Sequence, residues 1–183
     1  MKNTPVKMIL MAMTLGLFCC SSIKVSTDYD QQADFSKYKT YTLTDEAKEL
    51  RISDLDRRRL LEALESGLAA KGFSASPNGD ILVDLKINTE QKETTTATTN
   101  GPYGSAYRYR WGSGFSTTDI DVERYIEGTL FIDFIDAKKK QLVWQGRGVK
   151  TLDPYATPQE KEQRIKSAVN TILAKYPPRT KPK

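Results

Sequence analysis

Two strand-like runs separated by a short polar segment constrain the fold more than any other feature of this sequence. Tyr125–Ile135 and Leu142–Val149 are rich in β-branched and aromatic residues, and Ala137–Lys140 connects them. This arrangement is typical of a β-hairpin. Glycines within the two runs indicate bulges or places where another backbone comes close; they are Gly128, Gly146 and Gly148. One face of the hairpin is predicted to carry Ile126, Leu130, Ile132, Phe134, Leu142 and Trp144.

Three further segments are predicted to be strands. Ile23–Thr27 and Thr40–Thr42 contain β-branched and aromatic residues. Ile81–Asn88 alternates apolar and mostly polar residues, as a half-buried strand does. The polar connection between the first two strands is expected to be held to the domain by its aromatic side chains, which are Tyr29, Phe35 and Tyr38.

Two segments carry the start and stop signals of helices. Ser53 is a predicted N-cap, and Gly72 is the expected stop of that helix. Thr157, Pro158 and Glu160 supply a capping threonine, a proline at the first helical position and a capping-box glutamate for the second helix. The stripe predicted to be buried comprises Leu61, Leu64 and Leu68 in the first helix, with Leu60 at its edge, and Ile165, Ala168, Val169, Ile172 and Leu173 in the second.

Strands joined by short connections and interrupted by two helices predict an α+β fold, with a mostly antiparallel sheet and both helices packed on one face. We expect a single domain over residues 23–176 and a disordered basic tail over residues 177–183. The basic run Arg57–Arg59 lies close to Asp54 and Asp56, so these residues are predicted to pair on a solvent-facing helix surface.

The N-terminal residues are typical of an export signal that ends in a lipidated cysteine. Lys2 and Lys7 precede the apolar run Met8–Phe18, whose 11 residues fall short of the about 20 that span a bilayer. Cys20 follows the run and is the predicted site of acylation, with residues 1–19 removed and residues 20–22 left as a tether. The alternatives are a secretory signal without lipid and an N-terminal helix.

Lipidation would leave the mature domain without a free thiol or a disulfide, because Cys19 would depart with the signal. The formal net charge of +5 would fall to +3 with the loss of two lysines. This weak positive charge is compatible with an anionic membrane surface and gives no indication of nucleic acid as a partner. The predicted membrane partner is therefore engaged through the lipid anchor.

A segment rich in threonine, glycine and aromatic residues interrupts the strand pattern. Residues 94–118 are predicted to form a long loop, and aromatic and arginine side chains alternate within Tyr103–Phe115. Such a loop either folds back on its own domain or contacts a glycan, a lipid headgroup or another envelope protein. The candidate binding residues are Tyr103, Tyr107, Arg108, Tyr109, Arg110, Trp111 and Phe115.

The composition removes several enzyme classes. The chain contains no histidine, which excludes Ser-His-Asp triads, Cys-His dyads and imidazole metal ligands. Asp119, Asp121 and Glu123 would share one face of a strand, but a solvent-facing strand explains them better than a cation site does. Asp133 and Asp136 are likewise predicted to face solvent. We therefore predict no catalytic residue, no metal site and no cofactor.

Several segments of the chain together resemble a bacterial lipoprotein family known only as domain of unknown function 4136. They are Val25–Thr42, Asp80–Val83, the glycine-rich aromatic loop, Tyr125–Leu130, Leu142–Gly146 and the final helix that ends near paired prolines. The resemblance implies an exported, lipid-anchored α+β domain and supplies no catalytic residues. Serine after the cysteine follows the sorting pattern for the outer membrane, facing the periplasm.

These observations predict a non-enzymatic, lipid-anchored envelope protein that binds or scaffolds a partner, which would be another envelope protein or a glycan. The first alternative is a glycan- or small-molecule-binding module that uses the same loop and a concave face of the sheet. The second is an envelope hydrolase that depends on carboxylates.

Overall fold

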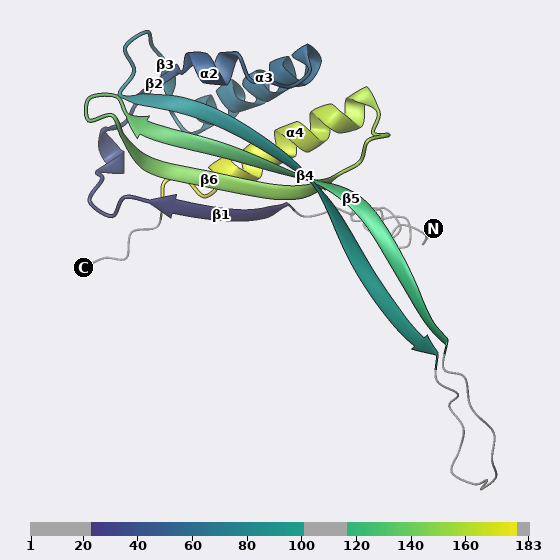
Figure 1. The fold of residues 1–183 in the computed structure, drawn as a ribbon. Coiled ribbons are helices and arrows are strands. Elements are labelled where there is room, and N and C mark those ends of the chain that lie inside the picture. The colour runs from purple at the N-terminus through teal and green to yellow at the C-terminus, as the bar shows by residue number, and fades with distance from the viewer. Residues whose placement is uncertain (1–22, 101–116, 179–183) are drawn as a thin grey trace, which may run out of the picture.

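The computed structural model describes residues 23–100 and 117–178. These residues form one six-stranded sheet with its main helices on one face (Figure 1), which confirms the predicted α+β fold. The order is β1-β6-β5-β4-β2-β3; β2 runs parallel to β3 and β4, and the other neighbours are antiparallel. The strands are β1 (Lys24–Tyr29), β2 (Thr40–Leu43), β3 (Ser74–Ala75), β4 (Ile81–Asn100), β5 (Thr117–Asp136) and β6 (Gln141–Leu152).

The helices in the described residues are α2 (Asp45–Lys48), α3 (Asp54–Ala70) and α4 (Pro158–Leu173), besides a short 3-10 helix (Phe35–Lys37). The two predicted helices, α3 and α4, begin directly after their predicted caps, whereas α2 was not predicted. Ser53 Oγ accepts a hydrogen bond from the backbone N–H of Asp56, and Thr157 and Glu160 form a complete capping box. Gly72 adopts a φ of +85°, a left-handed conformation that glycine tolerates at a helix end. The α4 helix ends at Leu173, before the prolines that were expected to end it.

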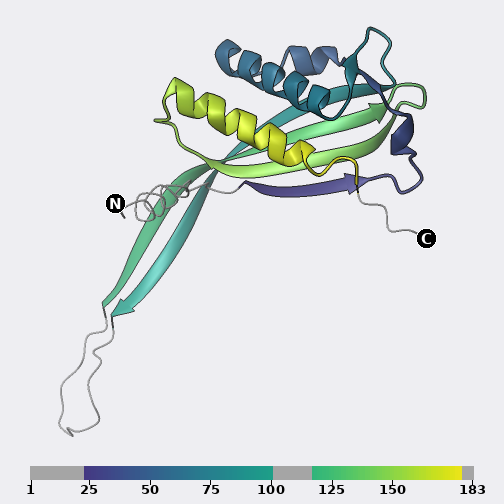
Figure 2. The same ribbon diagram turned by 180° about the vertical axis from the view of Figure 1, so that it is seen from behind.

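The core lies between the sheet and the helices α3 and α4, which pack side by side on the same face (Figure 2). Leu64, Leu68 and Trp144 are fully buried there. The predicted buried positions need three corrections. Leu60 is buried whereas Leu61 is only half-buried, Ile165 and Ala168 of α4 are half-buried, and Leu142 is 49% exposed. A β-bulge follows Phe134, so that Leu142 pairs with Ile135 on the face away from the helices while Trp144 pairs with Phe134.

Glycines in β6 let α4 approach the sheet. A Cβ placed on Gly148 would lie 2.7 Å from Cδ1 of Ile172, and one on Gly146 would overlap with Ile172 and Trp144. Side chains at these positions would therefore push the helix away from the strand. The close neighbours at both positions are side chains rather than the other backbone that the sequence suggested.

The β4–β5 hairpin extends far beyond the other strands as a two-stranded arm (Figure 1). Pairing with β6 begins only at Ile126, and pairing with β2 is confined to residues 81–83 of β4. The prediction of a loop from residue 94 was wrong at its edges, because residues 94–100 pair with residues 117–123. Threonine is β-branched and fits a pleated strand well, so the threonine run continues the ladder.

Several predictions fall outside the described residues. They concern the signal segment 1–19, the acylation of Cys20, the binding residues between Tyr103 and Phe115, and the tail from residue 179. Within residues 23–100 and 117–178, no helix is long and apolar enough to cross a membrane.

Candidate functional site

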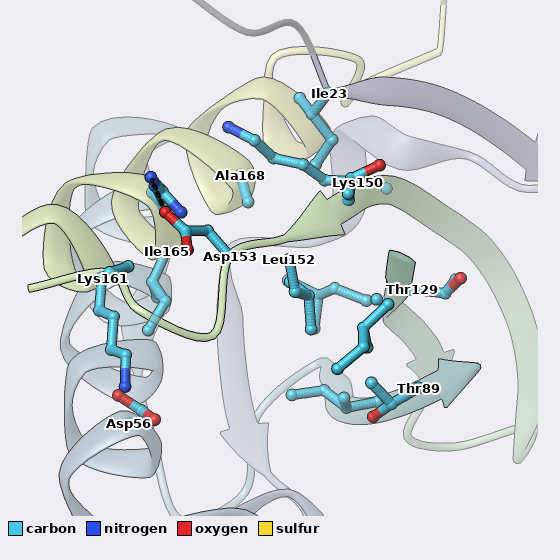
Figure 3. Close-up of a pocket in the computed structure, with 18 of the residues that line it drawn as sticks. Ile23, Asp56, Thr89, Thr129, Lys150, Leu152, Asp153, Lys161, Ile165 and Ala168 are labelled. Carbon is cyan, nitrogen blue, oxygen red and sulfur yellow. Dashed lines mark hydrogen bonds and ion pairs between the residues drawn. The ribbon is translucent and has the colours of Figure 1, made fainter. Parts of the chain in front are cut away.

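A pocket of about 440 Å³ opens where the arm leaves the sheet, between the sheet and the helices α3 and α4 (Figure 3). This volume falls within the range of about 300–1,000 Å³ that is usual for small-molecule sites. Most of its wall is apolar, with aliphatic side chains from α3 and α4, from the turn before α3, from the N-terminal residue of the described chain and from the strands β4, β5 and β6. These side chains are Ile23, Ile52, Leu60, Ile87, Ile126, Leu130, Leu152, Ile165 and Ala168.

Three large apolar side chains of the wall remain exposed. Ile87 is 38% exposed, Ile126 37% and Leu152 45%, and Ile126 is the direct cross-strand partner of Leu152. An exposed cluster of this kind is unfavourable in water unless another apolar group covers it. Gly128 also lines the pocket and has no side chain to fill it. The pocket is therefore suited to the apolar part of a ligand.

Charged side chains surround the apolar wall. Asp153 accepts a hydrogen bond from the backbone N–H of Tyr155 at 3.0 Å and pairs with Arg164 at 3.2 Å, and these contacts lower the pKa of its carboxyl. Asp56 pairs with Arg59 at 2.7 Å. Lys150 and Lys161 also line the pocket, and neither forms an ion pair with another described residue. The positive charge at the mouth is thus only partly neutralised.

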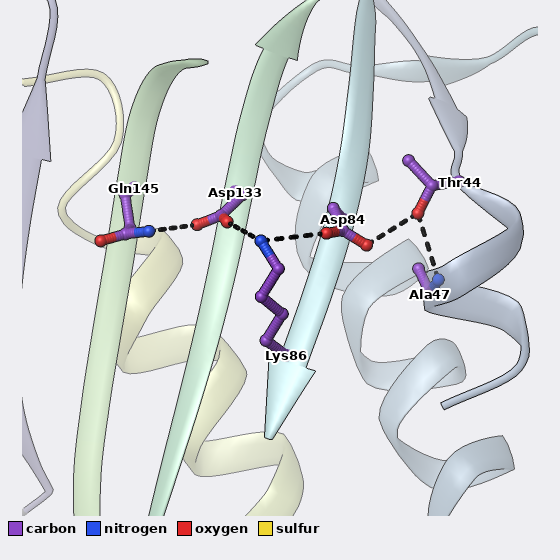
Figure 4. A network of polar contacts seen from close by, with 6 residues as sticks. All are labelled: Thr44, Ala47, Asp84, Lys86, Asp133 and Gln145. Carbon is purple, nitrogen blue, oxygen red and sulfur yellow. Dashed lines mark hydrogen bonds and ion pairs between the residues drawn. The ribbon is translucent and has the colours of Figure 1, made fainter. Parts of the chain in front are cut away.

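A second polar cluster lies on the opposite face of the sheet (Figure 4). The ammonium of Lys86 lies 3.0 Å from Asp133 Oδ2 and 3.4 Å from Asp84 Oδ2. Gln145 donates to Asp133 at 2.8 Å, and Thr44 donates to Asp84 at 2.8 Å while capping α2. The hydrogen bond to Asp133 is the main cause that raises the pKa of Lys86. The cluster thus links β4, β5 and β6 to the start of α2.

The prediction that Asp133 and Asp136 face solvent was wrong. Asp133 is 3% exposed and Asp136 8%. Asp136 accepts hydrogen bonds from Tyr38 Oη at 2.9 Å and from the backbone N–H groups of Lys138 and Lys139 at 2.9 and 2.8 Å. Both buried carboxylates are satisfied by hydrogen-bond donors, of which Tyr38 and Lys86 are distant in the sequence and Lys138 and Lys139 lie in the turn after β5. These donors are used in holding the fold together.

The paired charges on α3 agree with prediction. Arg57 lies 2.6 Å from Asp54, and Arg59 lies 2.7 Å from Asp56. Arg59 is nevertheless only 19% exposed in its side chain, so the pair stands at the edge of the pocket rather than on an open helix face.

Comparison with known proteins identifies the family of this chain. Residues 25–178 match the family described as domain of unknown function DUF4136. The chain belongs to the DUF4136 family. No curated protein shows significant sequence similarity to it.

The DUF4136 domain also resembles solved structures at low identity. A PDZ domain protein from Parabacteroides distasonis aligns with a TM-score of 0.54 and 14% identity over 87% of this chain. That alignment covers 36% of the other protein, so the chain spans about a third of its length, and the similarity concerns the fold. A variant PelC dodecamer from Paraburkholderia phytofirmans aligns with a TM-score of 0.41 and 14% identity, over 87% of this chain and 100% of the other.

The carboxylates that sequence analysis weighed as a cation site are spread along the arm of the DUF4136 domain. Asp121 pairs across the ladder with Thr96, and Glu123 with Thr94, and both acidic residues are exposed. Asp119 lies in β5 opposite Thr98. Among the residues whose structure is described, no group of three or more Cys, His, Asp or Glu side chains is arranged to hold a metal ion.

No local pattern in the sequence indicates the pocket by itself. The alternation of residues predicts Ile126 and Ile87 on apolar strand faces, but whether α3 and α4 cover these faces depends on how the helices cross the sheet. The sequence carries one partial signal of the pocket. Ile126 and Ile87 continue an apolar face toward a polar segment, and that segment has few further apolar residues to cover the two side chains.

Proposed function

We propose that this DUF4136 domain is a non-enzymatic, lipid-anchored envelope protein that binds the apolar part of a small molecule in the pocket beside α4. The observation that carries the proposal is the exposed apolar cluster of Ile87, Ile126 and Leu152 inside a pocket of about 440 Å³. A preformed apolar concavity with a few polar groups at its mouth is the usual form of a ligand site.

Lipid anchoring at Cys20 rests on the N-terminal sequence. Ile23, which lines the pocket, follows Cys20 by three residues. Three residues span at most about 10 Å, so an acylated Cys20 would hold the pocket close to the membrane surface. We place the protein at the outer membrane, facing the periplasm, on the basis of Ser21. The test is fractionation of cells that express Cys20→Ala: the variant should leave the membrane fraction, and retention there would contradict lipid anchoring.

The absence of an enzyme activity is supported by the chemistry of the chain. It contains no histidine, and its buried carboxylates Asp84, Asp133 and Asp136 accept hydrogen bonds from residues that hold the sheet together. A general acid or base needs a carboxyl that is free to exchange its proton with a substrate.

Ligand binding in the pocket can be tested with Nile red, an uncharged dye that fluoresces in apolar surroundings. The full chain should enhance its fluorescence. Ala168→Phe and Thr89→Trp would each fill the pocket from a different wall and should abolish the enhancement. Leu142→Trp is the matched control, because it adds the same aromatic group to the opposite face of the sheet and should leave binding unchanged. Equal fluorescence with all four proteins would contradict the proposal.

A second candidate function is the docking of an envelope protein or a glycan on residues 103–115. The observation that favours it is the arm, because β4 and β5 run beyond the rest of the sheet as far as Asn100 and Thr117, which flank this segment in the sequence. Crosslinking in intact cells would test it, with wild type compared with a variant in which residues 101–115 are replaced by a Gly-Ser linker. A partner captured only by wild type would support docking, and identical profiles would contradict it.

A further inference from the structure

We infer that the ligand of the pocket is a single-chain anionic amphiphile, with its alkyl chain on the apolar wall and its carboxylate or phosphate group at the edge of the pocket, where Lys150 and Lys161 stand on separate sides. This inference rests on the proposed function and adds the chemical class of the ligand. It follows from the distribution of charge around the pocket and from the position of the two lysines.

Only some of the charged side chains at the pocket form ion pairs. Its lining includes three cations and two carboxylates. The Asp153 carboxylate is taken by Arg164, and Asp56 is held by Arg59, which stands outside the lining. Lys150 and Lys161 are therefore the two cations of the lining that form no ion pair with another described residue. An anionic group at the mouth would pair with one of them.

The two lysines lie at the boundary between the apolar wall and solvent. Figure 3 shows Lys150 beside Ile23 and Ala168, and Lys161 extending from α4 toward Asp56 on α3. Both side chains are half-buried. A lysine in such a position packs its methylene groups on apolar surface and keeps its ammonium in contact with water. The site thus offers an apolar interior with cationic groups at its edge.

This arrangement favours an amphiphile over the other ligands considered. A glycan would place hydroxyl groups against aliphatic side chains that cannot hydrogen-bond to them. An uncharged apolar molecule would leave both ammonium groups without a counter-charge. A pocket of about 440 Å³ lies near the lower end of the usual range for ligand sites, which favours one alkyl chain over two.

The test uses three probes that share a ten-carbon chain and differ in the charge of the head: decanoate, 1-decanol and decyltrimethylammonium. They are titrated into the full chain carrying Cys20→Ala, which prevents acylation. Decanoate should bind up to about fivefold more tightly than decanol, as one partly exposed charge pair allows, and decyltrimethylammonium should bind most weakly. The advantage of decanoate should shrink at high salt.

Two double variants with the same change in net charge identify the groups responsible. Lys150→Gln with Lys161→Gln should remove the difference between decanoate and decanol while decanol binding remains. Lys138→Gln with Lys139→Gln, in the turn at the other end of β5, should keep the difference. Thermal unfolding of each variant checks that it is folded.

The possible outcomes separate the inference from the function on which it rests. If the protein binds none of the three probes, the proposed function and the inference are both wrong. If decanoate and decanol bind equally well, the pocket binds apolar groups and the inference alone is overturned. A preference for decanoate that survives in the Lys150 and Lys161 double variant also overturns it, because other groups then recognise the anion.

Discussion

Asp84 on β4 and Asp133 on β5 are direct cross-strand neighbours, and both are buried although they lie on the sheet face away from the helices. Like charges at such positions repel each other. Lys86 removes this conflict, since its ammonium lies within 3.4 Å of one carboxylate and 3.0 Å of the other. A single exposed lysine thus permits two buried acids to stand side by side.

Lys86→Met is expected to lower the free energy of unfolding by about 1–2 kcal/mol, because both carboxylates lose a charged donor while keeping one neutral partner each. Adding Asp133→Asn to this variant should recover part of the loss by removing the repulsion. Chemical denaturation of the single and double variants measures both effects. Lys48→Met is the control: its exposed pair with Asp45 should contribute less than about 0.5 kcal/mol. Equal losses for the two lysines would contradict the bridging role.

Asp136 should make the domain sensitive to acid. The backbone N–H of Lys139, the hydroxyl of Tyr38 and the backbone N–H of Lys138 stabilise its carboxylate and lower its pKa. A pKa that is lower in the folded state adds stability at pH values above the ordinary aspartate pKa of about 3.9, and this stability is lost as the pH falls through the lowered value.

The measurement is urea denaturation at pH 7 and at pH 3. Asp136→Asn should destabilise the domain at pH 7 by about 1–2 kcal/mol and should lose less stability than wild type on going to pH 3. Acid sensitivity should remain in part, because hydrogen bonds from Lys39 and Thr40 also lower the pKa of Asp80. Tyr38→Phe removes one of the three donors and should have a smaller effect. An unchanged pH dependence in Asp136→Asn would contradict this account.

Gly148 should be intolerant of a side chain. In Gly148→Ala the new Cβ would lie 2.7 Å from Cδ1 of Ile172 and 2.7 Å from Cδ1 of Ile23, which should cost about 1–3 kcal/mol of stability. Ile172→Val removes the first of these Cδ1 atoms, so the double variant should be more stable than the sum of the two single changes predicts. Gly72→Ala is the comparison, since it is strained by its φ of +85° and meets no atom within 4 Å. Its cost should not depend on residue 172.

Much of the fold could be predicted because its signals are local. The caps at Ser53 and Thr157 depend on residues within one helical turn, and alternation in Ile81–Leu85 predicts the apolar face of β4 that packs on the core. The hairpin between β5 and β6 is likewise a short-range feature. Each of these signals is complete within about ten residues, so neighbouring sequence suffices to read it.

The buried carboxylates and the pocket both depend on long-range contacts, which no local sequence pattern contains. Asp136 is buried by Tyr38, which is 98 positions away in the sequence, and Asp133 is paired with Lys86, which is 47 positions away. The pocket exists because α4 leaves Leu152 and Ile126 uncovered, and this depends on how the helix crosses the sheet. The threonine run of β4 could have been predicted as a strand, because β-branched residues favour strands. The composition of the whole segment suggested a loop instead.

The arm should be separable from the folded domain. Beyond Lys92 and Tyr125 the two strands pair only with each other among the described residues, and Arg124 and Glu93 form a cross-strand ion pair at 2.7 Å that is more than half exposed. Replacing residues 93–124 by Asn-Gly, a sequence that favours a two-residue hairpin turn, should therefore keep the pocket wall and the core intact.

We expect this shortened protein to unfold within about 0.5 kcal/mol of wild type, because the described part of the deleted segment contributes no side chain to the core. Thermal unfolding measures the stability, and Nile red fluorescence shows whether the pocket still binds. Retained binding would assign ligand recognition to the pocket alone. A large loss of stability would instead mean that the arm packs against another part of the protein, and a loss of binding without unfolding would make the arm part of the ligand site.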